Sequence, residues 1–408
     1  MTLRSPLAPV RFPDLPAIDG LRLAVAASGL KYRNRHDLLL MTLSETTNVA
    51  GVFTQSDTAA APVIWSRDVV ASGRAGAILT NAGNANAFTG ECGQDAVHQI
   101  SKALARALDI SADQILLAST GIIGEPLEPT KLSAHFPELV ANQDASWKQA
   151  AEAILTTDTF PKGAHVACDI DGIPVNICGI AKGSGMIAPN MATMLSFIAT
   201  DATLPADLLQ TLLTKTNDQS FNSITVDSDT STNDSVFLIA TGRANTPRIV
   251  HPDDPKLAGF CDMLRQLMVD LATQIVRDGE GASKFITITV SGANSDYQAR
   301  RIGLAIANSP LVKTAIAGED ANWGRIIMAV GKSGFGINQQ TIGLKIGGFP
   351  VAANGMRVAD YEEAPIAKHM LASSIDIAVS VGCGAGRATV YSCDLTHGYI
   401  SINADYRS

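Results

Sequence analysis

The sequence has few charged residues, no long hydrophobic run and no cluster of basic residues. Charged side chains make up 17% of its 408 residues, and the formal net charge is −8. Without a run of Lys or Arg, a surface that follows a nucleic-acid backbone is not expected. No apolar stretch approaches the length of a membrane span, and residues 1–6 lack the apolar core of a signal peptide. These absences predict a cytoplasmic protein with neither nucleic acid nor membrane as a partner.

Cysteine and histidine are also too scattered to form a recognisable metal site. The six cysteines contain no CxxC pair, and the seven histidines contain no HExxH pattern and no local pair at ligand spacing. A zinc site and a disulfide framework are therefore not predicted, and reduced thiols fit best. No bound metal is therefore expected.

What the chain does contain is enough apolar sequence, 46%, to fill a large core. Strand-like and helix-like segments alternate along it, which predicts an α/β or mixed α+β fold. Helices are expected from about residue 93, around residues 208–213 and over 257–275, the last ending in a glycine cap at 278–281. Strands are expected over 77–79, 115–118, 194–200, 236–240 and 285–290. Near the end, the segments 375–381, 387–393 and 399–403 are typical of a small antiparallel sheet.

The most informative segment is AKGSGMIAPNMATML at residues 181–195. Its glycines allow close approach of a ligand, and Pro189 and Asn190 hold a turn just before a threonine that opens a buried strand. Such a segment is often an ordinary loop entering a strand. A hydroxyl placed there can also attack the preceding carbonyl, after which the freed α-amine of Thr193 could serve as the base for its own side chain.

This string resembles, nearly residue for residue, the cleavage motif of the bifunctional ornithine acetyltransferase and N-acetylglutamate synthase family of arginine biosynthesis. The resemblance extends from residues 48–54 to Ser408. It implies self-cleavage between Ala192 and Thr193, giving an α chain of residues 1–192 and a β chain of residues 193–408 that stay interleaved. Two of each chain are expected in the assembly. The implied fold is a self-cleaving amino-terminal-nucleophile architecture, with two mixed sheets between helical layers and a smaller C-terminal antiparallel part.

Ser119-Thr120-Gly121, at the end of the strand predicted over 115–118, is a candidate oxyanion site. A hydroxyl and an unhindered glycine N–H are suitable donors to a developing negative charge, although the tripeptide alone is more typical of a turn. The resemblance assigns Thr120 and Gly121 to the oxyanion hole.

An amino-acid substrate needs charged partners of both signs. Lys182 can hold a carboxylate, and Glu280 can hold a side-chain ammonium. Taken alone, the lysine would be a solvated loop charge and the glutamate a helix-end carboxylate facing water. The resemblance assigns substrate binding to both, and also to Thr156, Thr193, Asn403 and the terminal Ser408.

Three other segments have no assigned chemistry. Residues 227–234 are rich in carboxylates but lack the glycine and distal glutamate of a calcium loop, so a hydrogen-bonded turn near the site is expected. Residues 319–325 resemble a family signature that caps a helix. Gly331-Lys332-Ser333 lacks the first glycine of a phosphate-binding loop, which counts against a nucleotide-binding enzyme.

The resemblance implies a ping-pong transfer of acetyl from N2-acetyl-L-ornithine to L-glutamate through an acetyl-Thr193 intermediate. No bound cofactor is expected, because an ester on threonine stores the acyl group. Acetyl-CoA stays open as a second donor, since members with and without that activity share these motifs. Two rival hypotheses also stay open: an aminopeptidase-type hydrolase of the same self-cleaving fold, and an uncleaved amino-acid-binding protein.

Overall fold

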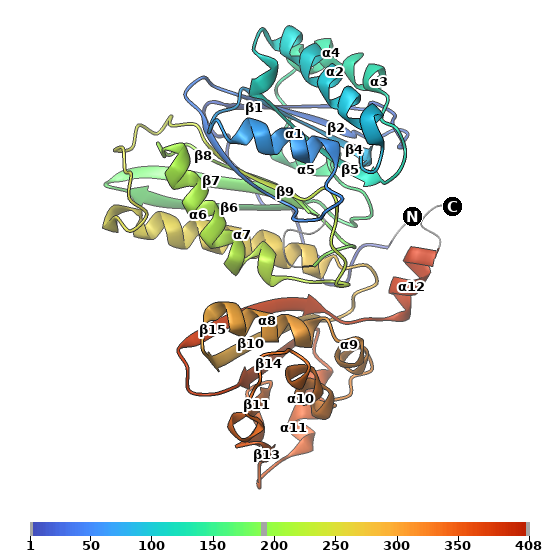
Figure 1. Cartoon of the computed structure of the whole chain (residues 1–408), viewed down its shortest axis with the longest axis vertical. Helices are drawn as coiled ribbons and strands as arrows, with labels where there is room; N and C mark the ends of the chain where they lie inside the picture. The colour runs from blue at the N-terminus through green and yellow to red at the C-terminus, as the bar shows by residue number, and fades with distance from the viewer. Residues whose placement is uncertain (1–2, 189–193, 405–408) are drawn as a thin grey trace.

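In the computed structural model, which describes residues 3–188 and 194–404, helices and strands alternate in layers. Figure 1 shows an upper body of two sheets with helices above, between and below them, and a smaller sheet-and-helix unit beneath. The expected mixed α/β class, with two mixed sheets between helical layers, is confirmed.

The first sheet is four-stranded, in the order β1-β2-β4-β5. Its strands are β1 (Leu21–Ala26), β2 (Leu38–Leu43), β4 (Ala77–Asn84) and β5 (Ile115–Ile122). β4 and β5 run parallel, linked by the amphipathic α2 (Gly90–Leu108). One face of this sheet packs against α2, α3 (Pro129–Ser133) and α4 (Phe136–Ala141). The other face packs against α1 (Ala61–Val70) and α5 (Trp147–Ala153), which lie between the two sheets.

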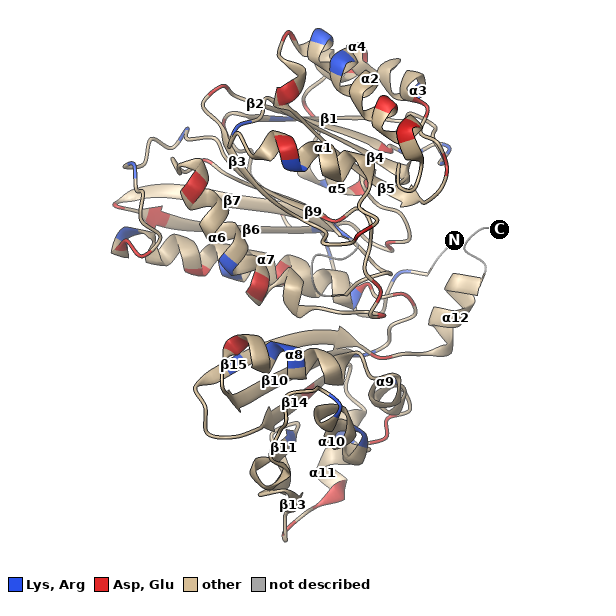
Figure 2. Cartoon of the chain, viewed as in Figure 1, with Lys and Arg blue, Asp and Glu red and all other residues tan. Residues whose placement is uncertain are grey.

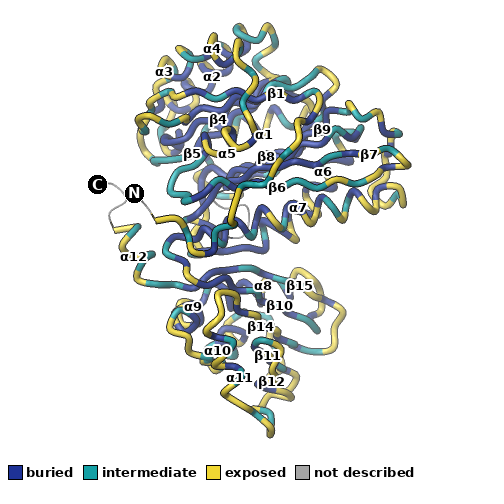
Figure 3. The backbone as a smooth tube through the Cα atoms, turned by 180° about the vertical axis from the view of Figure 1, so that it is seen from behind, coloured by how far each residue is buried: buried dark blue, intermediate teal, exposed yellow. Residues whose placement is uncertain are grey.

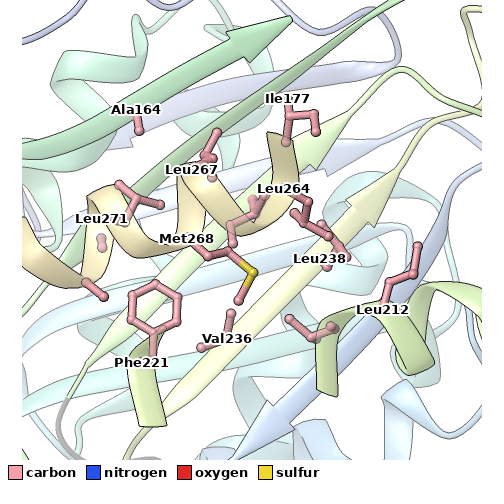
Figure 4. Close-up of a cluster of buried hydrophobic side chains, with 14 of the residues drawn as sticks. Ala164, Ile177, Leu212, Phe221, Val236, Leu238, Leu264, Leu267, Met268 and Leu271 are labelled. Carbon is pink, nitrogen blue, oxygen red and sulfur yellow. The ribbon is translucent and has the colours of Figure 1, made fainter. Parts of the chain in front are cut away.

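The second sheet is five-stranded, in the order β3-β9-β8-β7-β6. Its strands are β3 (Asn48–Phe53), β6 (Lys162–Ile170), β7 (Ile173–Lys182), β8 (Leu195–Thr200) and β9 (Ser235–Ala240). Every residue of β8 and β9 is buried because helices cover both faces, which explains their nearly continuous apolar sequences. The outer face packs against α6 (Ala206–Gln219) and α7 (Ala258–Arg277). Figure 4 shows Leu264, Leu267, Met268 and Leu271 of α7 pointing toward the strands.

The expected cleavage site lies between two neighbouring strands of this sheet. β7 and β8 are antiparallel partners, with Lys182 opposite Leu195. Ala192 and Thr193 fall between them, outside the described residues. The five-stranded sheet thus takes β3, β6 and β7 from before the expected cut and β8 and β9 from after it, so no domain boundary separates the two parts.

The C-terminal unit is a six-stranded sheet, larger than the sequence predicts. Its order is β13-β12-β11-β14-β10-β15, and all its pairs are antiparallel except β10 with β14. The strands are β10 (Phe285–Ala293), β11 (Gly343–Ile346), β12 (Phe349–Ala353), β13 (Met356–Arg357), β14 (Ser374–Ser380) and β15 (Gly386–Cys393). Its helices are α8 (Asp296–Ala307), α9 (Pro310–Ala317), α10 (Trp323–Gly331) and α11 (Glu363–Met370). α10 begins directly after Asn322 in the expected capping signature.

The strand expected over residues 399–403 is wrong, because this segment lies in helix α12 (His397–Ala404). Tyr-Ile-Ser-Ile alternates as a strand does, but no strand of the six-stranded sheet pairs with it. A helix satisfies its own backbone groups where no neighbouring strand can. Near the start of α12, the backbone of Gly398 packs closely against that of Gly281. The glycine cap expected for α7 is also wrong, since Gly279, the glycine next to the C-cap residue Asp278, does not have the positive φ of such a cap.

Charged side chains lie mainly on the outer helices, and buried residues lie mainly in the strands. Figure 2 shows both signs of charge along the outer helices of the upper body. In Figure 3 the strands of the upper sheets are largely buried, whereas α12 is intermediate to exposed. Within residues 3–188 and 194–404, no helix combines the length and apolar character needed to cross a bilayer.

Candidate active site

Six of the expected site residues line one cavity of about 280 Å³. They come from β5, β7, the loop after α7, α12 and the segment after α5: Thr120, Gly121, Thr156, Lys182, Glu280 and Asn403. Thr193, Ala192 and Ser408 lie outside the described residues. An open groove of about 830 Å³ between α1 and α2 contains none of the six.

Gly121 is held where only glycine fits. Its φ is +139°, and a Cβ there would lie 2.2 Å from the carbonyl carbon of Gly83 on the parallel neighbour β4. β5 continues through Gly121 to Ile122, so Thr120 lies on a strand rather than in the turn that the tripeptide alone indicated. The glycine N–H and the Thr120 hydroxyl are therefore carried by a rigid sheet edge at the cavity.

Lys182 is a buried cation and not a solvated one. It is the last residue of β7 and is 3% exposed. Its Nζ donates to Thr156 Oγ1 at 2.8 Å and to Thr120 Oγ1 at 3.3 Å. Burial lowers the pKa of Lys182, and Asp158, whose Oδ2 is 3.9 Å from Nζ, opposes that shift. Lys182 thus links the expected oxyanion residue to an expected substrate-binding threonine.

A buried charge network that no sequence motif predicts lies beside Lys182. Lys162 Nζ donates to Asp158 at 2.8 Å and to Asp278 at 2.6 Å, and the three side chains are fully buried. Asp158 also accepts the backbone N–H groups of Thr156 and Gly183 at 3.0 and 2.6 Å. Burial opposes its ionisation, but the ammonium groups of Lys162 and Lys182 hold the pKa of Asp158 below its ordinary value. Asp158 and Asp278 are 120 residues apart and both pair with Lys162, an arrangement that only the fold could reveal.

Glu280 is also buried, at 8% exposure, and does not face water. Its Oε2 accepts from Asn403 Nδ2 at 2.7 Å, which ties α12 to the cavity. Its backbone N–H donates to Ser184 O at 3.1 Å. Gly185 leaves room for this carboxylate, since a Cβ there would lie 2.5 Å from Glu280 Oε2. The glycine-rich loop and the glutamate therefore fit each other.

The carboxylate-rich segment 227–234 is a hydrogen-bonded turn at the cavity, as expected. Asp227 accepts the N–H groups of Met186 and Ile187 at 2.6 and 2.9 Å. Asn233 lines the cavity, and its Nδ2 donates to the backbone oxygens of Ala85 and Ser119 at 2.6 and 2.9 Å. Among the described residues, no three His, Cys, Asp or Glu side chains are grouped to hold a metal ion. Through the hydrogen bond from Asn233 to Ser119 O, the segment holds β5 in place near the cavity.

The cavity therefore presents a cation and an anion to the same small volume. Lys182 lies beside the donors on β5, and Glu280 lies beside Asn403. Opposite charges at two positions suit a ligand that carries both a carboxylate and an ammonium group.

The whole-chain comparison agrees with the resemblance drawn from residues 181–195. The model of the ArgJ family matches residues 22–408. The chain belongs to the ArgJ family. "Arginine biosynthesis bifunctional protein ArgJ" of Agrobacterium fabrum is 50% identical over 408 residues, 99% of each chain. The Gluconobacter oxydans protein of the same name is 51% identical over 405 residues, 99% of this chain and 95% of the relative. A solved ArgJ structure from Bacillus halodurans is 43% identical with a TM-score of 0.51, covering 52% of this chain and all of that one.

Proposed function

We propose that this ArgJ family member transfers acetyl from N2-acetyl-L-ornithine to L-glutamate in arginine biosynthesis, with Thr193 as the nucleophile. The observation that carries the proposal is the placement of Lys182 and Glu280 on one cavity beside Thr120 and Gly121. The names of its relatives in arginine biosynthesis support the pathway.

The charges of the cavity match N-acetylornithine. The substrate carboxylate would take the ammonium of Lys182 and the hydroxyl of Thr156, which already touch each other. The side-chain ammonium would take the carboxylate of Glu280, supported by Asn403 and, through the family resemblance, by Ser408. Glutamate has no side-chain ammonium group, and its carboxylate would bind the same residues, Lys182 and Thr156.

Maturation would precede catalysis. The Thr193 hydroxyl oxygen adds to the carbonyl carbon of Ala192, its proton passes to the Thr193 nitrogen, and the C–N bond breaks to leave an ester. Water then hydrolyses the ester, which returns the Thr193 hydroxyl and releases the Ala192 carboxylate. The products, residues 1–192 and 193–408, would remain joined through the five-stranded sheet, because that sheet takes strands from both.

Transfer then takes two steps through one ester. The free α-amine of Thr193, whose pKa is ordinarily far below that of lysine, accepts the hydroxyl proton while the oxygen attacks the acetyl carbonyl. Thr120 and the Gly121 N–H stabilise the oxyanion, and ornithine leaves with the proton. The glutamate amine next attacks the acetyl-Thr193 ester and carries the acetyl group away. No bound cofactor enters this scheme, and acetyl-CoA is a second acetyl donor to be tested. The proposed assembly contains two α chains and two β chains.

Intact mass spectrometry tests this proposal directly. Purified protein incubated with N-acetylornithine should give two fragments, the second starting at Thr193 and carrying one added acetyl group. Addition of glutamate should remove that acetyl group as N-acetylglutamate. Release of acetate instead would favour the aminopeptidase-type hydrolase. A single uncut chain that binds ornithine would favour the amino-acid-binding protein. Parallel incubation with acetyl-CoA in place of N-acetylornithine decides whether it is a donor.

Variants at Thr193 provide the control. Thr193→Ala should give a single uncut chain without transfer, because it has no hydroxyl. Thr193→Ser should cut and transfer more slowly, since it keeps the oxygen but loses the methyl group that restricts its rotamer. A Thr193→Ala protein that is both cut and active would contradict the assignment.

A further inference from the structure

α12 carries Asn403 to the cavity, yet none of its eight residues is buried within the described part of the chain. Figure 1 shows this helix at the side of the body, beyond the end of β15. An isolated helix so short is marginally stable in water, and most helices in proteins are stabilised by burying an apolar face. Contacts at the start of α12 must therefore fix where Asn403 lies.

One contact joins the start of α12 to the residue after Glu280. Thr396 Oγ1 donates to Gly281 O at 2.7 Å and accepts the Gly398 N–H at 3.0 Å. Gly281 has a φ of +73°, and a Cβ there would lie 2.4 Å from Tyr399 N. The first turn of α12 therefore lies directly against the backbone next to the Glu280 carboxylate.

A second contact joins α12 to the glycine-rich loop. Tyr399 Oη donates to Asp227 Oδ2 at 3.3 Å. Asp227 also accepts the backbone N–H groups of Met186, Ile187 and Asp229 at 2.6, 2.9 and 3.3 Å. Burial raises the pKa of Asp227, but backbone N–H groups can only donate, so these bonds are made to a carboxylate. Burial and the charge of Asp227 raise the pKa of Tyr399, so its hydroxyl keeps its proton and donates.

The same tyrosine orients the amide that meets Glu280. Asn403 Nδ2 donates to Tyr399 O at 3.1 Å and to Glu280 Oε2 at 2.7 Å. Tyr399 is thus held by Asp227 through its side chain, and it holds Asn403 through its backbone. Loss of a contact at the start of α12 would let Asn403 move, and with it the Glu280 carboxylate.

We propose that Thr396 and Tyr399 are positioning residues that make the cavity specific for an acetyl donor with a side-chain ammonium group. The inference rests on the proposed function, in which Glu280 takes that ammonium, and it names the residues that hold Glu280 in place. Neither Thr396 nor Tyr399 lines the cavity. Lys182 and Thr156, which would hold the donor carboxylate, contact each other and do not depend on α12 for that contact.

N-acetylnorleucine tests this inference, because a methyl group replaces the ammonium of N-acetylornithine at the same chain length. The wild type should prefer N-acetylornithine. Tyr399→Phe removes a hydroxyl, and Thr396→Val replaces one by a methyl group. Each should lower that preference, as a ratio of kcat/KM values, roughly 3-fold or more, and the double variant about 10-fold, since each loses hydrogen bonds at the start of α12. The change should appear as a higher KM for N-acetylornithine with little change in kcat, because no reacting group is altered.

Matched substitutions elsewhere provide the controls. Tyr297→Phe makes the same change in α8, where Tyr297 is 59% exposed. Thr211→Val removes a hydroxyl that donates to Asp207 O on the exposed surface of α6. Both controls should keep the wild-type preference and the wild-type KM for each donor.

The outcomes distinguish positioning from general damage. A selective loss for N-acetylornithine supports the inference, whereas an equal loss for both donors, or an unchanged preference, overturns it. If Thr396→Val does not fold, Tyr399→Phe decides alone, because phenylalanine keeps the ring and its packing. A wild-type protein that transfers acetyl from neither donor, or that does not distinguish them, contradicts the proposed function instead.

Discussion

Replacing Asp158 by asparagine removes one negative charge from a buried group that also contains Lys162, Lys182 and Asp278. The carboxylate accepts from Lys162 Nζ at 2.8 Å and from two backbone N–H groups, and it lies 3.9 Å from Lys182 Nζ. Asparagine offers one acceptor oxygen in place of two, and no charge. Lys162 would keep Asp278, but Lys182 would lose the carboxylate closest to its ammonium.

The expected loss is large because the remaining partners stay buried. Removing one member of a buried ion pair costs about 3–5 kcal/mol of unfolding free energy. The pKa of Asp158 is lower in the folded chain than its ordinary value of 3.8, so its contribution is fully present above that value and is lost as pH falls toward the folded pKa. The difference between wild type and variant should therefore be constant from roughly pH 5 to 8 and shrink below about pH 4.

Unfolding is best compared in a Thr193→Ala background, where a single chain species is expected. Asp171→Asn is the control, because Asp171 also pairs with a lysine at 2.8 Å, Lys256, but both side chains are well exposed. Exposed pairs contribute little, so this variant should unfold as the parent does. Asp158→Asn and Asp171→Asn chains with the same urea midpoint at pH 7 would refute the role given to the buried network.

Two further predictions concern the cavity. Gly185→Ala should leave the fold stable but lower kcat/KM on the order of 10²-fold, because the new Cβ displaces the Glu280 carboxylate. Gly331→Ala is the control, since a Cβ there would meet nothing within 4 Å. Equal kinetics of the two variants would count against the role of Glu280 in substrate binding. Burial lowers the pKa of Lys182, so kcat/KM should fall at alkaline pH with a midpoint below the ordinary lysine value of 10.5. Asp158→Asn should move that midpoint lower still, and an unchanged limb would show that the Lys182 ammonium is not required.

Local sequence was sufficient for the helices and strands with strong periodicity. α2, α6 and α7 lie where apolar residues recur at helical spacing. β8 and β9 lie where short apolar runs predict strands, and β10 lies where apolar residues alternate with threonine. The alternating apolar pattern of residues 399–403 gave a wrong strand prediction. A strand needs a neighbouring strand, and distant residues decide whether one is present. The extra strands β11, β12 and β13 were missed for a related reason, since each is short and is stabilised by its partners.

By itself, the sequence determined the family and the residues expected to carry the chemistry, because these lie in contiguous strings such as 181–195. Tertiary structure decided their environment. Lys182 and Glu280 are buried around one cavity, and Asp158 and Asp278, 120 residues apart, both pair with Lys162. A side chain's type is local, but its burial and its charged neighbours depend on which distant segments pack together. The pKa shifts of Lys182 and Asp158 follow from that packing.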